Sequence, residues 1–297
     1  MAAAGKRGAR RAGVCACSGM GWTLTDDLEE FLTRASGFLR GDPVANTVAL
    51  TVAEAMRTQG PGLYGETLLG WWTAAGRVAG VCMWTGAHPL LLSAMPQAAA
   101  AELADALAGR DAKVPEVNGA RAAAGAFAEA WTSRTGAASG VRMRQRLYRL
   151  DRLDVPDPPP EGAARTAGGG DRELVLEWFA TFYRDAGQSR PVNTELVDGR
   201  LAEGGLTLWE AGGRPVSMAG RTPVVAGMAR VAPVYTPAAH RRRGYGAAVT
   251  AAVTAGALDA GAAHVVLFTD LADPTSNGIY QGLGYRPVED RVALSFT

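Results

Sequence analysis

The sequence predicts an α/β protein of two domains that share one order of secondary-structure elements. At 297 residues the chain is long enough to bury two hydrophobic cores. The pattern of helix, helix, hairpin, strand, helix, strand, helix, strand occurs twice, which indicates an internal duplication of fold, although no sequence repeat is visible. A proline-rich stretch unsuited to a sheet separates the two series. The predicted divisions are a disordered leader at 1–20, an N-terminal domain at 21–153, a linker at 154–163 and a C-terminal domain at 164–297.

Composition narrows the class of protein. With 47% hydrophobic and 20% charged residues, the chain resembles an ordinary globular protein. A net charge of +1 argues against a general nucleic-acid binder, which needs a basic excess. The sequence has no apolar run long enough for a membrane span or a signal peptide. We therefore expect a cytoplasmic protein with no membrane partner. The cysteines Cys15, Cys17 and Cys82 are too few for a disulfide framework, and we expect no metal site.

The first half begins with a helix signal. Thr25 is the predicted N-cap, because the acidic residues of 26–30 follow it and suit the positive end of a helix. Apolar periodicity and turn residues then predict a helix at 44–56, hairpin strands at 67–72 and 78–84, a strand at 90–93, a helix at 97–108, a strand at 114–117, a helix at 119–135 and a strand at 141–150.

The second half repeats this order. Gly212 and Gly213 mark the turn of its hairpin. The patterns predict helices at 171–185 and 193–203, hairpin strands at 206–211 and 215–221, a strand at 228–235, a helix at 244–260, a strand at 264–269, a short helix at 276–282 and strands at 285–288 and 292–296.

The most informative segment joins the strand at 228–235 to the helix at 244–260. It carries the arginine cluster 241–243 followed by Gly244 and Gly246. Unpaired amides of a helix's first turn favour an anion, and glycines let a phosphate approach the backbone. Arginines add charge-assisted hydrogen bonds. The segment therefore predicts a pyrophosphate site, whereas the corresponding stretch of the first half, at 94–98, has neither the glycine pair nor the basic cluster.

Two motifs make the C-terminal half resemble the GNAT superfamily of acyl-CoA-dependent N-acetyltransferases. Arg241-x-x-Gly244-x-Gly246 is similar to the family's pyrophosphate loop, and residues 280–285, Tyr-Gln-Gly-Leu-Gly-Tyr, are similar to its second signature. The resemblance implies in each half a mixed, mostly antiparallel sheet flanked by helices, with a splayed fourth strand in the C-terminal copy. The tandem arrangement with a degenerate first copy also resembles bacterial two-domain members of that superfamily.

The resemblance implies roles for particular residues. Strand residues 234–236 correspond to the splayed strand, whose free backbone groups pair with pantetheine and stabilise the oxyanion. Tyr280 stands at the position of the general acid that protonates the departing thiolate. Asp273 stands where members of the family carry an asparagine, so Asn277 is the better candidate for a cofactor contact from this helix. The implied acetyl-CoA contacts are Val234, Tyr235, Thr236, Arg241, Arg242, Arg243, Gly244, Tyr245, Gly246, Ala247, Asn277 and Tyr280.

The general base is not fixed by the resemblance, because no glutamate occupies the customary positions. Glu210 on the hairpin, Asp270 at the end of the strand at 264–269, and a water chain remain the candidates. Glu210 is equally consistent with a solvated strand residue, and Asp270 with a turn residue. No cysteine lies near the motifs, so we expect direct attack on the thioester in a ternary complex.

The predicted function is N-acetyltransfer from acetyl-CoA to a primary amine, either a small molecule or a protein N-terminus, bound between the domains. The alternatives are a non-catalytic acyl-CoA binding or sensing protein and a structural dimerisation protein with a vestigial loop. The sequence leaves open whether the protein is a monomer or a homodimer.

Overall fold

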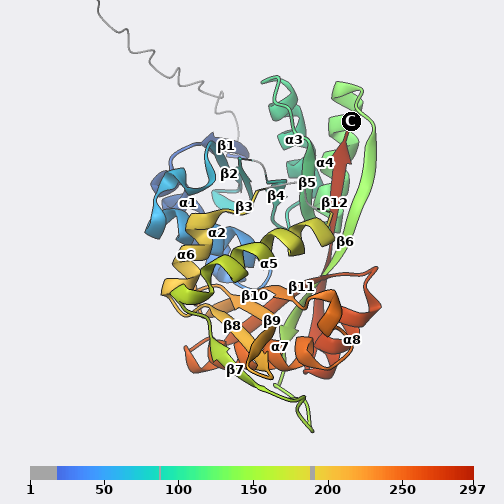
Figure 1. Ribbon diagram of the computed structural model, residues 1–297. Helices are drawn as coiled ribbons and strands as arrows, with labels where there is room; N and C mark the ends of the chain where they lie inside the picture. Colours follow the sequence, from blue (N-terminus) through green and yellow to red (C-terminus); the bar gives the residue numbers. More distant parts are fainter. Residues whose placement is uncertain (1–18, 87, 188–190) are drawn as a thin grey trace, which may run out of the picture.

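The computed structural model describes residues 19–86, 88–187 and 191–297, and its strands form one twelve-stranded sheet (Figure 1). The strand order is β1-β2-β3-β4-β5-β12-β6-β11-β10-β9-β8-β7. Residues 1–18 of the predicted leader, including Cys15 and Cys17, lie outside the described residues. Among the described helices, none combines the length and apolar character that a bilayer crossing requires.

The N-terminal half follows the predicted order with one added strand. Asp27, and not Thr25, is the N-cap of the first helix, because its carboxylate accepts hydrogen bonds from the amides of Glu29 and Glu30. Thr25 instead ends an unpredicted strand. The elements are β1 (Gly21–Thr25), α1 (Leu28–Gly41), α2 (Thr47–Gln59), η1 (Pro61–Tyr64), β2 (Thr67–Ala74), β3 (Arg77–Thr85), β4 (Leu90–Leu92), α3 (Gln97–Ala108), β5 (Glu116–Ala120), α4 (Arg121–Thr135) and β6 (Ser139–Leu150).

The C-terminal half differs from expectation at its two ends. A short strand, β7, starts at the end of the predicted linker, and the two strands predicted at 285–288 and 292–296 form one strand, β12, with register shifts along it. The elements are β7 (Ala163–Thr166), η2 (Gly169–Asp171), α5 (Arg172–Asp185), α6 (Thr194–Ala202), β8 (Leu206–Ala211), β9 (Arg214–Arg221), β10 (Met228–Tyr235), η3 (Ala238–His240), α7 (Tyr245–Asp259), β11 (His264–Asp270), α8 (Pro274–Gly282) and β12 (Tyr285–Phe296).

The two halves exchange their long strands. β6 continues the C-terminal half by pairing with β11 through 145–149, and β12 continues the N-terminal half by pairing with β5 through 291–295. β6 and β12 also pair with each other from end to end. Among the described strands only β4–β5 and β10–β11 pair in parallel. The mixed, mostly antiparallel character is confirmed, and the sheets of the two halves join into one.

One hydrophobic cluster is shared between the halves. Phe31 and Leu39 of α1 pack in the same cluster as Leu147 of β6, Met228 of β10 and Val266 of β11, and all five are fully buried. This cluster lies beneath α1 and α2, so burial of N-terminal side chains also fixes the strands of the C-terminal half. The predicted boundary at 154–163 stays a prediction, since core packing crosses it.

We expect Leu147→Ala to lower the free energy of unfolding by about 2–5 kcal/mol, because Leu147 has no exposed surface and its removal leaves a cavity shared by both halves. Val141→Ala on the same strand is the matched control, since Val141 is 52% exposed. Urea denaturation of both variants checks this. A Leu147→Ala protein as stable as the control would contradict the shared core.

Candidate active site

The sheet opens where β10 leaves β11. The parallel register of the two strands covers Met228–Val231 against His264–Leu267, yet β10 runs on to Tyr235 and β11 to Asp270. Beyond Val231, the backbone of β10 is therefore free of β11 and can pair with an extended ligand. The splay predicted for this strand is present in the structure.

The free end of β10 is held in place from its other side. Ser217 of β9 donates a hydrogen bond to the carbonyl oxygen of Tyr235 at 3.1 Å, and its hydroxyl lies 2.8 Å from that of Thr236. The ring of Tyr235 is buried and packs against Trp178 of α5, with 5.8 Å between ring centroids. These contacts keep the end of the strand rigid without using the edge that faces β11.

The loop after β10 has the backbone shape that an anion site needs. Arg242 and Gly244 both adopt positive φ, 62° and 81°, directly before α7. The first helical hydrogen bond runs from the amide of Ala248 to the carbonyl oxygen of Gly244, so the amides at 245–247 belong to the helix's unsatisfied first turn. Converging amides at such a turn form a concavity that attracts a phosphate.

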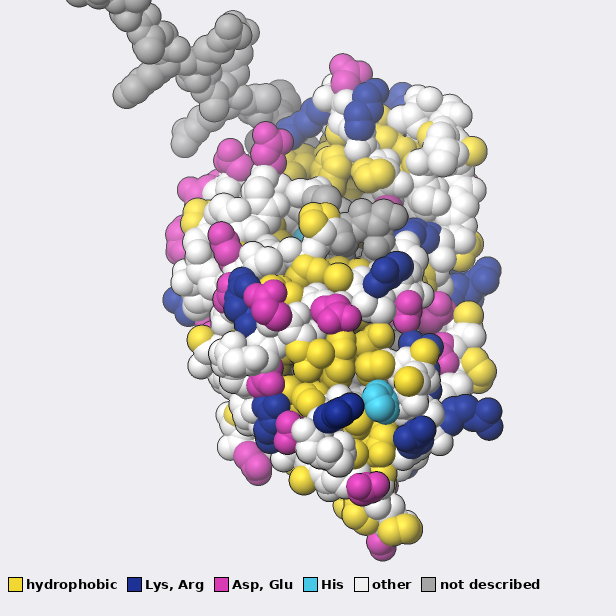
Figure 2. Space-filling model, in the orientation of Figure 1, with side chains coloured by type: hydrophobic (Ala, Val, Ile, Leu, Met, Phe, Trp, Pro, Cys, Tyr) yellow, Lys and Arg dark blue, Asp and Glu magenta, His cyan; other side chains and the backbone are white. Residues whose placement is uncertain are grey.

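The three arginines of the loop differ in their roles. Arg241 stabilises the loop, since its Nε donates to the carbonyl oxygen of Thr236 and its Nη2 lies 2.9 Å from Asp185 of α5. Arg242 and Arg243 are exposed at the mouth of the loop. Figure 2 shows hydrophobic side chains gathered over β10, β11 and α7 on this face, with both basic and acidic side chains around them. This surface suits an apolar chain that ends in phosphates.

Tyr280 lies in the core beside this opening. Its side chain is 8% exposed, and its ring is 6.3 Å from that of Tyr285 in an edge contact. Burial raises the pKa of Tyr280 to about 12, the negative charge of Asp273 acts in the same direction, and a hydrogen bond with Ser276 acts against them. The phenol therefore stays protonated at neutral pH and can act as a proton donor but not as a base.

The side chain of Asn277 is occupied by protein partners. Its amide nitrogen donates to the carbonyl oxygens of Asp270 and Asp273, and its oxygen accepts from the hydroxyl of Tyr148 at 2.9 Å. Tyr148 lies on β6 and also accepts from Gln281 at 3.0 Å. The cofactor contact expected of Asn277 stays a prediction, because in this structure its side chain bonds to protein groups, one of them on the exchanged strand β6. Asn277 fixes α8 against β11 and β6.

The two carboxylates proposed as bases have different surroundings. Glu210 forms an ion pair with Arg165 at 2.9 Å, and Arg165 also holds Asp171 through two hydrogen bonds. This cluster lies on β7 and β8, two strands away from β10, so Glu210 is a poor base. Asp270 lies at the end of β11, and its Oδ1 accepts from the amide of Ala272 at 2.9 Å. That turn contact leaves the carboxylate further acceptor capacity.

In the N-terminal half, the end of β4 corresponds to the end of β10, and an arginine side chain lies there. Arg291 of β12, only 4% exposed, donates to the carbonyl oxygens of Leu92 at the end of β4 and of Ala45, at 2.9 and 3.3 Å. Its Nη1 lies 3.2 Å from Glu289. The helix that follows β4 begins after Pro96 without a side-chain cap. A guanidinium thus occupies the end of β4, which agrees with the absence of an anion loop there.

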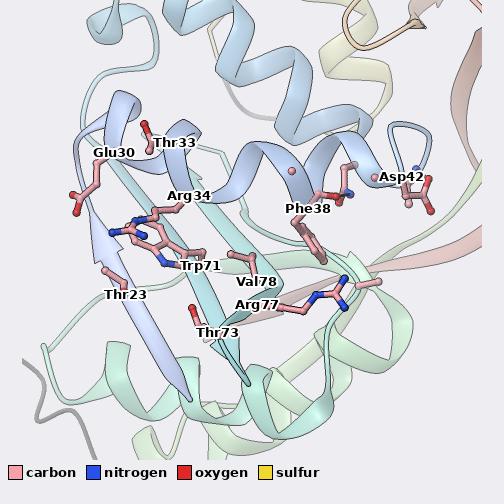
Figure 3. A pocket seen from close by; sticks show the side chains of 16 residues that line it. Thr23, Glu30, Thr33, Arg34, Phe38, Asp42, Trp71, Thr73, Arg77 and Val78 are labelled. Atoms are coloured by element: carbon pink, nitrogen blue, oxygen red, sulfur yellow. Dashed lines mark hydrogen bonds between the residues drawn. The ribbon is translucent and has the colours of Figure 1, made fainter. Parts of the chain in front are cut away.

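The N-terminal half has a wide surface hollow of its own. It measures about 950 Å³ and lies between α1 and the strands β2 and β3 (Figure 3). Figure 3 shows Arg34 of α1 close to Trp71 of β2 at one end, with Phe38 and Arg77 towards the other. Acidic and basic side chains both line it, so its charge favours no single kind of ligand.

Comparison with known proteins agrees with this geometry. Residues 172–285 match the acetyltransferase (GNAT) family. No curated protein matches the chain. Among solved structures, a GCN5-related N-acetyltransferase from Sphaerobacter thermophilus is 17% identical, with 92% of this chain and 94% of that chain covered and a TM-score of 0.60.

Two further structures extend over nearly the whole chain. An acetyltransferase of the GNAT family from Colwellia psychrerythraea is 12% identical, with 93% of this chain and 98% of that chain covered and a TM-score of 0.56. A tandem GNAT protein from the clavulanic acid biosynthesis pathway is 14% identical, with 94% of this chain and 98% of that chain covered and a TM-score of 0.56. At these identities the likeness establishes the fold.

We expect Tyr280 to make stability depend on alkaline pH. Because its pKa is raised to about 12 in the folded protein, its contribution is fully present below the unfolded pKa of about 10 and is lost as pH rises towards 12. Urea denaturation between pH 8 and pH 11 should show a steeper fall for the native protein than for Tyr280→Phe. Equal slopes would show that Tyr280 ionises normally.

Proposed function

Because the chain carries an acetyltransferase domain of the GNAT family over residues 172–285, we propose that it moves an acetyl group from acetyl-CoA to a primary amine. The observation that carries this proposal is the positive-φ turn of Arg242 and Gly244, which stands between the free end of β10 and the first turn of α7. The pyrophosphate would accept hydrogen bonds from the amides at 245–247, while Arg242 and Arg243 add positive charge.

The remainder of the cofactor would follow the strand. Pantetheine carries amide groups, which can pair with the backbone of 234–236 in the place that β11 leaves free. A backbone amide of this segment would then polarise the thioester carbonyl and stabilise the oxyanion formed on attack. The acetyl group would thus lie where β10 and β11 diverge, beside Asp270 at the end of β11.

The reaction proposed is direct transfer. The amine nitrogen forms a bond to the thioester carbon, the tetrahedral intermediate collapses, the carbon–sulfur bond breaks, and the amine loses one proton. Among the described residues the single cysteine, Cys82, has no exposed surface, and burial raises the pKa of its thiol. An acyl-enzyme on that thiol is disfavoured, because the thiolate is the nucleophile.

Two side chains are proposed to donate and accept the protons of the reaction. Tyr280 gives its proton to the thiolate as CoA departs; its phenol is protonated at neutral pH, and its raised pKa makes it a weaker acid than a free tyrosine. Asp270, with acceptor capacity to spare, receives the amine proton through water. Glu210 is set aside, since Arg165 holds its carboxylate.

A non-catalytic acyl-CoA binding protein is the second candidate function. The ion pair of Glu210 favours it, because this pair removes one of the carboxylates that could activate an amine. The acceptor of the catalytic proposal is a small molecule or a protein N-terminus.

We expect Gly244→Val to weaken CoA binding at least tenfold. A β-branched side chain at φ 81° is strained by about 1–3 kcal/mol, so the loop would lose the turn that aims its amides. Gly256→Ala is the matched control, since Gly256 lies within α7 and nothing stands within 4 Å of its added methyl group. Calorimetric titration with CoA measures both. Unchanged affinity in Gly244→Val would remove the loop from the cofactor site.

We expect Tyr280→Phe to lower kcat by about 10²-fold while the KM for acetyl-CoA changes little, because a general acid acts on the leaving group and not on cofactor binding. Release of free CoA in the presence of a panel of primary amines measures turnover. Cofactor binding without turnover on any amine would favour the sensing protein, and turnover unaffected by the substitution would exclude Tyr280 as the acid.

A further inference from the structure

A cavity lies between the two halves on the side of β10 that faces α2 and α6. It measures about 120 Å³, with α2 on one side, α6 on the other, and β10 and the preceding loop at its base. Thr58 and Gln59, at the end of α2, line it and are exposed, so the cavity reaches solvent. Neither of the two sequence motifs includes any residue of this cavity.

Two arginines line this cavity. Arg200 comes from α6, and its Nη1 donates to the carbonyl oxygen of Ala232 at 2.6 Å while its guanidinium lies 6.0 Å from the ring centroid of Phe179. Arg230 comes from β10, and its Nε is buried without a hydrogen-bond partner among the described residues. A guanidinium has five N–H donors, so both side chains have donors left for a ligand.

Within the described parts of the chain, neither Arg200 nor Arg230 forms an ion pair. Burial lowers the pKa of both, that of Arg230 to about 10, and the charge of Arg200 acts on Arg230 in the same direction. Both remain charged at neutral pH. Two neighbouring, half-buried cations repel each other, and an anion bound between them would relieve that repulsion.

The carboxylates that line the cavity do not pair with the two arginines. Glu54 is held by two hydrogen bonds from Arg57 on the surface of α2. Glu203 is exposed and raises the pKa of Arg200 only as a weaker influence than burial. The two arginines are therefore left available to a small anion that enters from solvent.

The place of the pair on β10 connects it to the proposed reaction. Arg230 precedes and Ala232 follows Val231, the last residue of β10 that pairs with β11. The acetyl group is proposed to lie where β10 and β11 diverge, after Val231, so Arg230 stands next to that point in the strand. One small molecule could reach both places, with its amine at the thioester and an anionic group at the arginines.

We propose that the acceptor is a primary amine bearing a carboxylate, and that Arg200 and Arg230 bind this carboxylate while the amine faces the thioester. The inference rests on the proposed acetyl transfer and adds the class of its substrate. A planar guanidinium matches a carboxylate through two parallel hydrogen bonds, and a cavity of about 120 Å³ suits a short aliphatic amino acid.

The first test needs no variant. Release of CoA from acetyl-CoA is measured with β-alanine, 4-aminobutyrate, 5-aminopentanoate and lysine, each beside its carboxamide, and with phosphoethanolamine. We expect at least one acid to have a KM at least tenfold below that of its amide. Amides that serve as well as the acids, or phosphoethanolamine as the preferred acceptor, would overturn the proposal while leaving acetyl transfer intact.

The second test removes the charge. Arg230→Gln should raise the KM for the acid roughly 10- to 100-fold and leave both the KM for acetyl-CoA and the KM for the amide unchanged, since a charge-assisted hydrogen bond is lost. Arg230→Lys, which keeps the charge but not the planar fork, should give a smaller rise. Arg110→Gln, an exposed position outside the cavity, is the control for net charge. An acid preference that survives in Arg230→Gln would contradict the assignment.

A binding measurement separates this inference from the proposed reaction. If no amine is acetylated, the CoA-loaded protein is titrated calorimetrically with the same acids and amides. Binding of the acids alone, lost in Arg230→Gln, would support the carboxylate site even though the reaction had failed. Equal binding of acids and amides, or of neither, would overturn it.

Discussion

The antiparallel pairing of β6 with β12 joins the two halves into one sheet. Each strand belongs by sequence to one half, yet completes the sheet of the other through β11 or β5. Through β6 the N-terminal half supplies Tyr148, which holds Asn277 and so fixes α8 beneath the opening. Through β12 the C-terminal half supplies Arg291, which occupies the end of β4. The same pairing thus positions α8 in the C-terminal half and places Arg291 at the end of β4 in the N-terminal half.

The segment of β10 around Val231 contributes to two features of the molecule. Towards β11, the strand is left with free backbone, where we propose that the pantetheine of CoA pairs. Towards α2 and α6, the same segment presents Arg230 and the carbonyl group that Arg200 contacts. Both features lie within a few residues of Val231, so the proposed acceptor and cofactor sites would share a single strand.

Helices and loops that depend only on neighbouring residues are predictable from the sequence. The helix at 97–108 was expected with the bounds that α3 has, and the loop of Gly244 was found because glycines before a helix are a local signal. The pairing partners of the strands are not predictable in this way, because alternation of apolar and polar residues identifies a strand but not its neighbour. The strand exchange therefore does not follow from the sequence patterns. For the same reason the contact of Asn277 with Tyr148 could not be predicted, since Tyr148 lies on the exchanged strand. The cavity of Arg200 and Arg230 draws on α2, α6 and β10, which no single stretch of sequence reveals.

The strand exchange also bears on whether the two halves can be separated. A chain cut at the proline-rich stretch would deprive β11 of β6 and β5 of β12, and each freed edge invites aggregation. The half without an anion loop therefore contributes more than a neighbouring surface, because it lends the other half a strand of its sheet.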